Sequence, residues 1–542
     1  MSNLQTGGGP ALVKIDTGRR EPLRRIWRYV GYDEPNYTYT PNGRALLAKL
    51  GRLSDAPYFI RCHFMLCSGD GTGRPKWGST NVYTEDQEGN PVYSWPIVDR
   101  ILDATLETGC VPFVELGFMP RALTAAPELP YEGAKAEGWR YPPRDYGRWM
   151  DLIRALARHC LERYGLREVS RWTWELWNEP DISYWRGTAA EYGRLYDYTV
   201  TGLLSAIPQA RVGGPGTTSP GHPQAGAFLR AFLEHCTHGT NAVTGKTGTR
   251  LDYISFHTKG GGYGVEPGAP KKTPTIRTLA GHVAAGLEIV AAFPELRRHE
   301  VILSECDPDG WAAGSIRDNP NLFYRNTEYY ASYVAHAACK LVDLTNDLGP
   351  RIDGMLTWAF QFEGRELFAG LRTLSTNGVD KPVLNVFRLL ARLGGTRLHL
   401  DSERARDPLA RKEEDAPDTP PDISGIAAID GVGTIQVLLC SHHDDWDVQR
   451  PTQIKLVLSG PTPGRTYTVT CRTIDATKAN AHTAWVQMGR PRPPDESQLH
   501  KLHAAAQLEP ERLANVVSVK GKVELAMTLA THSVCLLEFV PA

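Results

Sequence analysis

Residues 172–180 read Trp172-Thr-Trp-Glu-Leu-Trp-Asn-Glu-Pro180, and this stretch is the most informative one about the fold. Large apolar residues alternate through its first five positions, which predicts a β-strand rather than a helix. Pro180 ends the strand, because proline cannot continue a regular ladder and biases the preceding residue away from helical angles. The strand therefore presents Glu179 at its carboxyl end, walled by tryptophans. Apolar surroundings favour the protonated form of a carboxylic acid, so the position suits a proton donor.

Strands and helices alternate on both sides of this stretch. Besides the central strand, apolar runs predict strands near 27–30 and at 58–66, 111–118, 211–216, 251–257, 300–305 and 354–362. Apolar residues at three- and four-residue spacing predict helices at 42–53, 96–108, 144–164, 227–235, 278–293, 327–344 and 383–393. Such alternation implies an α/β fold with a parallel sheet, and eight strands imply a (β/α)8 TIM barrel. A doubly wound open sheet is the alternative, but no GxGxxG turn follows a predicted strand.

The pattern changes after about residue 396. Residues 404–422 are dense in charge and proline and predict an exposed loop. Short alternating strands follow at 426–429, 434–440, 453–458, 466–471, 524–529 and 533–540, separated by turn residues. These predict a C-terminal β-sandwich, which a strand at 11–17 is expected to join. We therefore expect an N-terminal strand segment (1–17), a catalytic barrel (18–396) and a β-sandwich accessory domain (397–542).

Composition narrows the possible partners. The chain has 542 residues, of which 41% are hydrophobic and 22% charged, and its formal net charge is −1. The near-zero charge argues against nucleic acid or an anionic membrane as main partner. The N-terminus lacks the apolar core of a signal peptide, and no run reaches the roughly 18 apolar residues of a membrane span, so we expect a cytoplasmic protein. Ten cysteines without CxxC pairs are expected to be reduced, buried and structural. The sequence does not specify an oligomeric state.

A second carboxylate is expected at the end of another strand, because barrel active sites lie at the carboxyl ends of the strands. Glu115, Glu305 and Glu363 lie in or near predicted strand ends. Glu305 is the best candidate, since it ends an apolar run and a polar turn follows it. Glu115 lies within its strand, so we expect it to support the site. Paired carboxyl groups, one protonated and one ionised, are what retaining glycoside hydrolysis requires.

Several motifs occur in the order known from one enzyme family. They are Arg61-Cys-His63, Gly69-Asp70, Pro112-Phe-Val-Glu-Leu-Gly-Phe-Met-Pro120, Trp177-Asn-Glu-Pro180, Val212-Gly-Gly-Pro215, Asp252-Tyr-Ile-Ser-Phe-His257, Ser304-Glu305 and Lys381-Pro382. With these motifs, residues 25–395 resemble glycoside hydrolase family 39, the β-xylosidases and α-L-iduronidases. The resemblance implies a retaining (β/α)8-barrel glycosidase.

The resemblance also implies roles for individual residues. Glu179 would be the acid/base and Glu305 the nucleophile. The substrate would be bound by His63, Asn178, His257, Trp358, Phe118 and Glu363. The sequence departs from the family after the predicted strand at 251–257, where Lys259 replaces a tyrosine. Either Tyr263 supplies the missing hydroxyl or Lys259 faces an anionic group.

No metal or cofactor is expected. Cys62 and His63 are neighbours in a strand, so their side chains point to opposite faces. The run His442-His443-Asp444-Asp445 is expected to be an exposed turn. The two-carboxylate chemistry needs no metal ion, and the expected partner is a small oligosaccharide substrate.

The expected function is a retaining exo-glycosidase, namely a β-D-xylosidase releasing xylose from xylobiose and short xylo-oligosaccharides. An α-L-arabinosidase or an α-L-iduronidase would keep the mechanism and change the sugar. An iduronidase must hold a carboxylate, for which Lys259 is the candidate cation. A catalytically inactive carbohydrate-binding protein would lack a carboxylate, and both are present. An aldolase or isomerase barrel would need a phosphate-binding loop or a Schiff-base lysine on a strand, and neither is evident.

Overall fold

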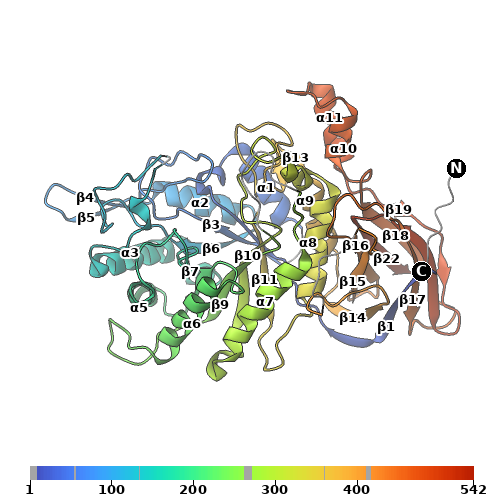
Figure 1. The fold of residues 1–542 in the computed structure, drawn as a ribbon, viewed down its shortest axis with the longest axis horizontal. Coiled ribbons are helices and arrows are strands. Elements are labelled where there is room, and N and C mark those ends of the chain that lie inside the picture. Colours follow the sequence, from blue (N-terminus) through green and yellow to red (C-terminus); the bar gives the residue numbers. More distant parts are fainter. Residues whose placement is uncertain (1–8, 54–55, 134, 262–270, 359, 411–416) are drawn as a thin grey trace.

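A computed structural model describes residues 9–53, 56–133, 135–261, 271–358, 360–410 and 417–542. Within these ranges a parallel sheet closes into an eight-stranded barrel, in the order β10-β11-β2-β3-β6-β7-β8-β9 (Figure 1). The barrel strands are β2 (Tyr29–Tyr32), β3 (Phe59–Cys62), β6 (Val111–Leu116), β7 (Thr173–Leu176), β8 (Arg211–Thr217), β9 (Tyr253–Lys259), β10 (Glu300–Asp307) and β11 (Ile352–Trp358). The predicted barrel is confirmed, and the alternative of an open sheet is wrong.

Helices cover the barrel because each buries one apolar face. The long ones are α1 (Pro41–Gly51), α2 (Pro96–Glu107), α3 (Tyr146–Tyr164), α5 (Ala189–Ala206), α6 (Pro223–His238), α7 (Ile276–Ala291), α8 (Glu328–Leu341) and α9 (Pro382–Ala391). Helix α5 was not predicted from the sequence, although Thr188 and Glu191 form a capping box at its start. Shorter pieces are α4 (Leu166–Val169), the strand pair β4 (Tyr83–Glu85) and β5 (Pro91–Tyr93), and the pair β12 (Ser375–Thr376) and β13 (Val379–Asp380). No helix of the described residues is long and apolar enough to cross a bilayer.

A curled mixed sheet forms the C-terminal β-sandwich. Its strand order is β19-β18-β22-β16-β15-β14-β1-β17-β21, and β20 pairs with β18. The strands are β1 (Ala11–Pro22), β14 (Thr396–Ser402), β15 (Asp422–Ile429), β16 (Ile435–His442), β17 (Thr452–Ser459), β18 (Thr466–Ile474), β19 (Glu511–Arg512), β20 (Val516–Val517), β21 (Lys522–Leu529) and β22 (Ser533–Pro541). Their inward side chains share one hydrophobic core. Figure 1 shows β1, in blue, lying among the C-terminal strands.

Two parts of this region differ from expectation. Strand β14 was not predicted from the sequence, nor were the helices α10 (Ala481–Gln487) and α11 (Glu496–Ala505) between β18 and β19. The division at residues 17, 396 and 397 stays a prediction. The ten cysteines are free and buried, as expected of structural thiols.

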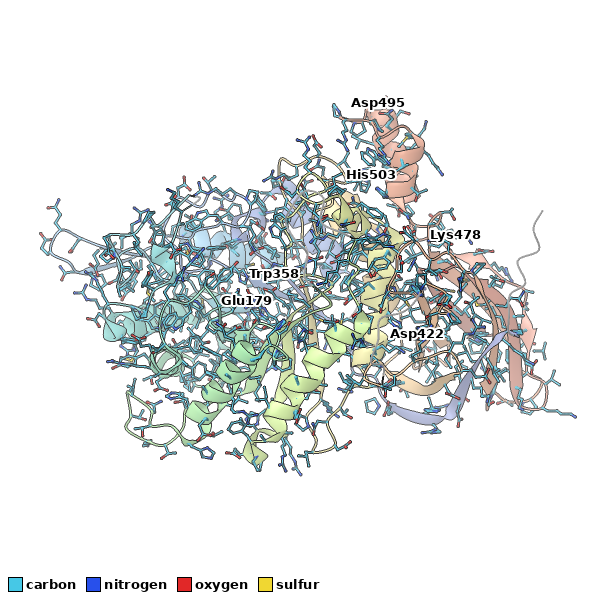
Figure 2. All side chains as sticks on the ribbon, viewed as in Figure 1. Glu179, Trp358, Asp422, Lys478, Asp495 and His503 are labelled. Atoms are coloured by element: carbon cyan, nitrogen blue, oxygen red, sulfur yellow. The ribbon has the colours of Figure 1, made fainter. Side chains whose placement is uncertain are left out.

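Helix α8 lies between the barrel and the sheet, and a histidine cluster is buried there. The ring of His336 on α8 stacks on His442 of β16 at 5.2 Å, and His532 lies 5.6 Å beyond His442. Figure 2 labels Asp422 at this boundary, where it pairs with Lys340. The predicted exposed turn at 442–445 is therefore wrong for its two histidines, because His442 ends β16 under α8 and both His442 and His443, which follows the strand, are buried.

Burial of these rings makes stability depend on pH. Burial lowers the pKa of both His336 and His532 to about 3. Between about pH 6.5, where an unfolded histidine titrates, and pH 3, the unfolded chain binds protons that the folded protein does not. The free energy of unfolding is therefore not reduced by these histidines above about pH 6.5, and it falls as the pH decreases from about 6.5 to 3.

We predict that His336→Phe weakens this pH dependence. The free energy of unfolding, measured with urea between pH 6.5 and 5, should fall less steeply than in the wild type, by about 1 kcal/mol per pH unit on average. The control is His238→Phe, since the His238 side chain is 58% exposed. An unchanged slope in His336→Phe would show that this ring is not the group that resists protonation.

Candidate active site

The strand that carries Glu179 ends in a sharp change of backbone direction. Strand β7 stops at Leu176, and both Trp177 (φ +66°) and Glu179 (φ +44°) adopt left-handed backbone angles. The main-chain N–H of Glu179 then donates to the carbonyl of Gly216 at the end of β8, at 2.9 Å. Residues other than glycine rarely adopt left-handed backbone angles, and such strained conformations concentrate at functional sites. The turn aims the carboxyl group of Glu179 across the barrel mouth.

Glu305 meets Glu179 at that mouth, with His257 between them. In the parallel pairing of β9 and β10, Glu305 stands beside His257. His257 Nδ1 lies 3.0 Å from Glu179 Oε1 and 3.7 Å from Glu305 Oε2. One oxygen of each carboxyl group and this nitrogen lie within 4.8 Å of one another. Retaining glycosidases keep their carboxyl groups about 5–5.5 Å apart, whereas inverting enzymes need about 6.5–9.5 Å, so the spacing is of the retaining kind.

Positive groups keep Glu305 ionised. Its Oε2 accepts from Lys259 Nζ at 2.6 Å, and its Oε1 lies 3.5 Å from His63 Nε2 and 3.7 Å from Arg61 Nη1. Burial by itself would raise the pKa of Glu305, but His257, Lys259 and His63 together hold that pKa well below its usual range. An ionised carboxylate is what a nucleophile needs.

Lys259 is shared between two carboxylates. Besides Glu305, it contacts Asp307 Oδ2 at 2.5 Å. Burial opposes the charged amine, but Asp307 and Glu305 raise the pKa of Lys259. Alternation along strands explains the cluster, because Lys259 lies two residues after His257 and Asp307 two residues after Glu305, so each pair shares a face. The sequence analysis missed Asp307 as a site residue, although this spacing could have found it.

Beneath Glu305 lies a fully buried arginine. Arg61 Nε donates to Glu175 Oε2 at 2.6 Å, and Nη2 lies 2.9 Å from Glu115 Oε2 and 3.1 Å from Asn178 Oδ1. Because Arg61 occupies the carbonyl oxygen of Asn178, the amide NH₂ of Asn178 is left to donate to a ligand. Arg61 was noted only within a motif, and its position two residues before His63 was the signal for its role.

Glu115 orients His63. Its Oε2 lies 2.5 Å from His63 Nδ1, so the other ring nitrogen faces Glu305. Burial disfavours the imidazolium, but Glu115 raises the pKa of His63 to about 9. Glu115 thus acts on the site through His63 and Arg61, as expected from its place within the strand.

Aromatic rings wall the site. The ring of Trp358 lies 4.3 Å from that of His63, and the ring of Phe118 lies 5.8 Å from it. Trp358 Nε1 donates to Asp33 Oδ2 at 3.2 Å, which fixes the indole. Figure 2 shows Trp358 and Glu179 together in the barrel part of the molecule.

The structure does not bring every predicted residue together. His63, Asn178, His257, Trp358 and Phe118 lie around the two carboxylates through the contacts above. Glu363 instead contacts the residue that caps α1. Its carboxylate accepts hydrogen bonds from Thr40 Oγ1 at 2.7 Å and from Gln361 Nε2 at 2.8 Å. Tyr263 lies outside the described residues.

The trio Glu179, His257 and Glu305 has the spacing of a metal site. The ammonium of Lys259, 2.6 Å from Glu305, already neutralises the carboxylate that a cation would need. The donor set therefore fits a protonated and an ionised carboxyl group better than a bound metal ion.

Comparisons with known proteins agree with this geometry. The family model described as glycosyl hydrolases family 39 matches residues 11–524. The chain is 27% identical to a β-xylosidase of Caldicellulosiruptor saccharolyticus, over 84% of this chain and 85% of that protein. It is 25% identical to the α-L-iduronidase of Mus musculus, over 92% of this chain and 76% of that protein. The structure of a monomeric β-xylosidase from Caulobacter crescentus CB15 matches with a TM-score of 0.78 at 23% identity, covering 98% of this chain and 99% of that chain.

We predict that Arg61→Met lowers the free energy of unfolding by about 3–5 kcal/mol, because it leaves Glu115 and Glu175 buried without their counter-charge. Urea unfolding followed by circular dichroism would measure the change. The control is Arg44→Met, which removes an exposed ion pair with Glu107 and should cost no more than about 1 kcal/mol. Equal, small losses in both variants would contradict a supporting role for Arg61.

Proposed function

The chain belongs to family 39 of the glycosyl hydrolases, and on that basis we propose that it is a retaining β-D-xylosidase. Its substrates would be xylobiose and short xylo-oligosaccharides, from which it releases xylose. The observation that carries the proposal is the pair Glu179 and Glu305, whose carboxyl oxygens lie within 4.8 Å at the barrel mouth. The match to two β-xylosidases over 84% and 97% of this chain supports the choice of sugar.

The reaction would proceed by two displacements. In the first, Glu179 protonates the glycosidic oxygen while an oxygen of Glu305 attacks the anomeric carbon, so the sugar–oxygen bond breaks and a glycosyl ester forms on Glu305. In the second, Glu179 takes a proton from water, the water oxygen attacks the anomeric carbon, and the ester bond breaks. Two inversions give net retention, and the covalent intermediate divides one difficult step into two easier ones.

The surrounding residues would position the sugar. The amide NH₂ of Asn178 would donate to the 2-hydroxyl, where hydrogen bonds strengthen in the transition state. His63 and His257 would contact the same sugar, and Trp358 and Phe118 would form its apolar floor. Contacts from Glu363 and Tyr263 remain predictions from the family resemblance.

A second candidate is an α-L-iduronidase, and Lys259 is the observation in its favour. Its ammonium lies beside Glu305, where a uronic acid could present its carboxylate. The same ammonium is already paired with both Glu305 and Asp307, which favours a neutral sugar. An α-L-arabinosidase would use the same carboxylates. For a xylosidase acting on short oligosaccharides, we also propose a cytoplasmic place of action.

We predict that initial rates on chromogenic glycosides will be highest on p-nitrophenyl β-D-xyloside. The panel includes the α-L-arabinofuranoside, the α-L-arabinopyranoside and an α-L-iduronide. Glu305→Ala should lower the best rate by several orders of magnitude, because the attacking oxygen is lost. Glu107→Ala, which removes an exposed glutamate of α2, should leave the rate unchanged.

The panel separates substrate from mechanism. If another sugar is hydrolysed fastest and Glu305→Ala still abolishes the rate, the mechanism stands and the proposed substrate is wrong. If Glu305→Ala keeps most of its activity on the best substrate, Glu305 is not the nucleophile.

A further inference from the structure

A strained turn lies beside the site described above. Residues 74–77 form a β-turn in which the N–H of Trp77 donates to the carbonyl of Arg74 at 2.9 Å. Pro75 occupies its second position and Lys76 its third, with φ +61°. Proline followed by a positive φ defines a type II turn, whose third position favours glycine. A lysine held in this conformation is strained, and such strain concentrates at functional sites.

The loop that carries this turn is firmly anchored. The Trp77 ring is buried and packs 5.2 Å from the ring of Phe64 and 6.0 Å from that of Tyr131. Two residues later, Ser79 exchanges two hydrogen bonds with the Asn36 side chain, of 2.8 and 2.9 Å. The anchors after the turn, together with the hydrogen bond from the main-chain N–H of Lys76 to Glu34 Oε1 at 2.5 Å, therefore set the position of Lys76.

Asp33 holds the ammonium of Lys76 toward the catalytic carboxylates. Lys76 Nζ donates to Asp33 Oδ1 at 3.0 Å, and this oxygen lies 3.8 Å from His63 Nε2, which in turn lies 3.5 Å from Glu305 Oε1. The Asp33 side chain is only 1% exposed, whereas that of Lys76 is 38% exposed. The carboxylate is thus an internal support, whereas the lysine side chain that it holds is partly exposed.

Lys76 lies on the opposite side of Glu305 from the acid/base. His63 lies near Glu305 Oε1 and is linked through Asp33 to Lys76, whereas His257, which contacts Glu179, lies near Oε2. The leaving group departs on the side of the proton donor. The ammonium therefore faces the far end of the sugar whose anomeric carbon Glu305 attacks.

The ring of Tyr184, from the loop after Glu179, lies 6.4 Å from that of His63 and 5.6 Å from that of Phe118. Burial raises the pKa of its phenol to about 12, the charge of Lys76 acts to lower it, and the carboxylates of Glu179 and Glu305 act to raise it. The phenol thus lies within electrostatic reach of Lys76 and of both catalytic carboxylates.

We propose that Lys76 is a specificity-determining residue that donates a hydrogen bond to the 3- or 4-hydroxyl of the terminal sugar. The assignment rests on the proposed function as a glycosidase that removes terminal sugars. An ammonium has three N–H donors, one of which is used by Asp33, and a sugar hydroxyl accepts readily. Charge-assisted hydrogen bonds are about twice as strong as neutral ones, so this contact selects sugars that carry the hydroxyl.

The test compares Lys76→Met and Lys76→Gly with the wild type on a glycoside and its 2-, 3- and 4-deoxy analogues. The series is built on whichever p-nitrophenyl glycoside the wild type hydrolyses fastest, so failure of the xyloside proposal leaves this test intact. Glycine suits the turn, so Lys76→Gly keeps the fold while removing the ammonium. Arg74→Met is the matched control, because it removes an exposed cation of the same turn that pairs with Glu132.

We expect both Lys76 variants to lose about 10- to 100-fold in kcat/KM on the parent glycoside and on its 2-deoxy analogue. On either the 3-deoxy or the 4-deoxy analogue the difference from wild type should vanish, and Arg74→Met should match wild type throughout. The proposal is overturned if both variants keep kcat/KM within threefold on the parent, or if they lose the same factor on every analogue. It is also overturned if only an iduronide loses its rate, because Lys76 would then bind a carboxylate.

Discussion

A buried carboxylate stays ionised only where opposite charge and hydrogen-bond donors replace water, and Glu305 depends on this constraint. Lys259 contacts one of its oxygens at 2.6 Å, while His63 and Arg61 approach the other. Those cations are themselves buried and need partners, which Asp307, Glu115 and Glu175 supply. The buried ion pairs of Asp307, Glu115 and Glu175 therefore stabilise the cations that keep Glu305 ionised. The site is a connected set of ion pairs rather than two independent acids.

The barrel needs only a few residues, placed at the ends of its strands, to build this set of ion pairs. Parallel strands end at one mouth, and residues two apart on a strand share a face, so His257 and Lys259 on β9 meet Glu305 and Asp307 on β10. Glu179 comes from a different strand and reaches the same point because its backbone turns back after β7. The sandwich contributes through α8, which packs on its strands, and we propose that it braces the barrel.

Much of this arrangement could be predicted from the sequence. Apolar periodicity located the barrel strands, and the break at Pro180 placed Glu179 at a strand end. Sequence periodicity did not predict burial where neighbouring elements cover a segment from several sides. His442 and His443 are an example, because their polar stretch resembles an exposed turn although both imidazoles are buried. Periodicity also predicted no ion pairs. Lys259 was expected only as a residue that could face an anionic group, and its pairing with Asp307 follows from the packed strands.

In a retaining mechanism Glu305 becomes covalently bound to the sugar. The most direct measurement is incubation with a 2-deoxy-2-fluoro xyloside bearing a good leaving group, followed by proteolysis and mass spectrometry of the labelled peptide. Fluorine at this position slows both steps and so lets the ester accumulate. We expect one sugar on the peptide that contains Glu305, and none in Glu305→Ala. A label on a different carboxylate, or an active enzyme that forms no adduct and releases the inverted sugar, would contradict it.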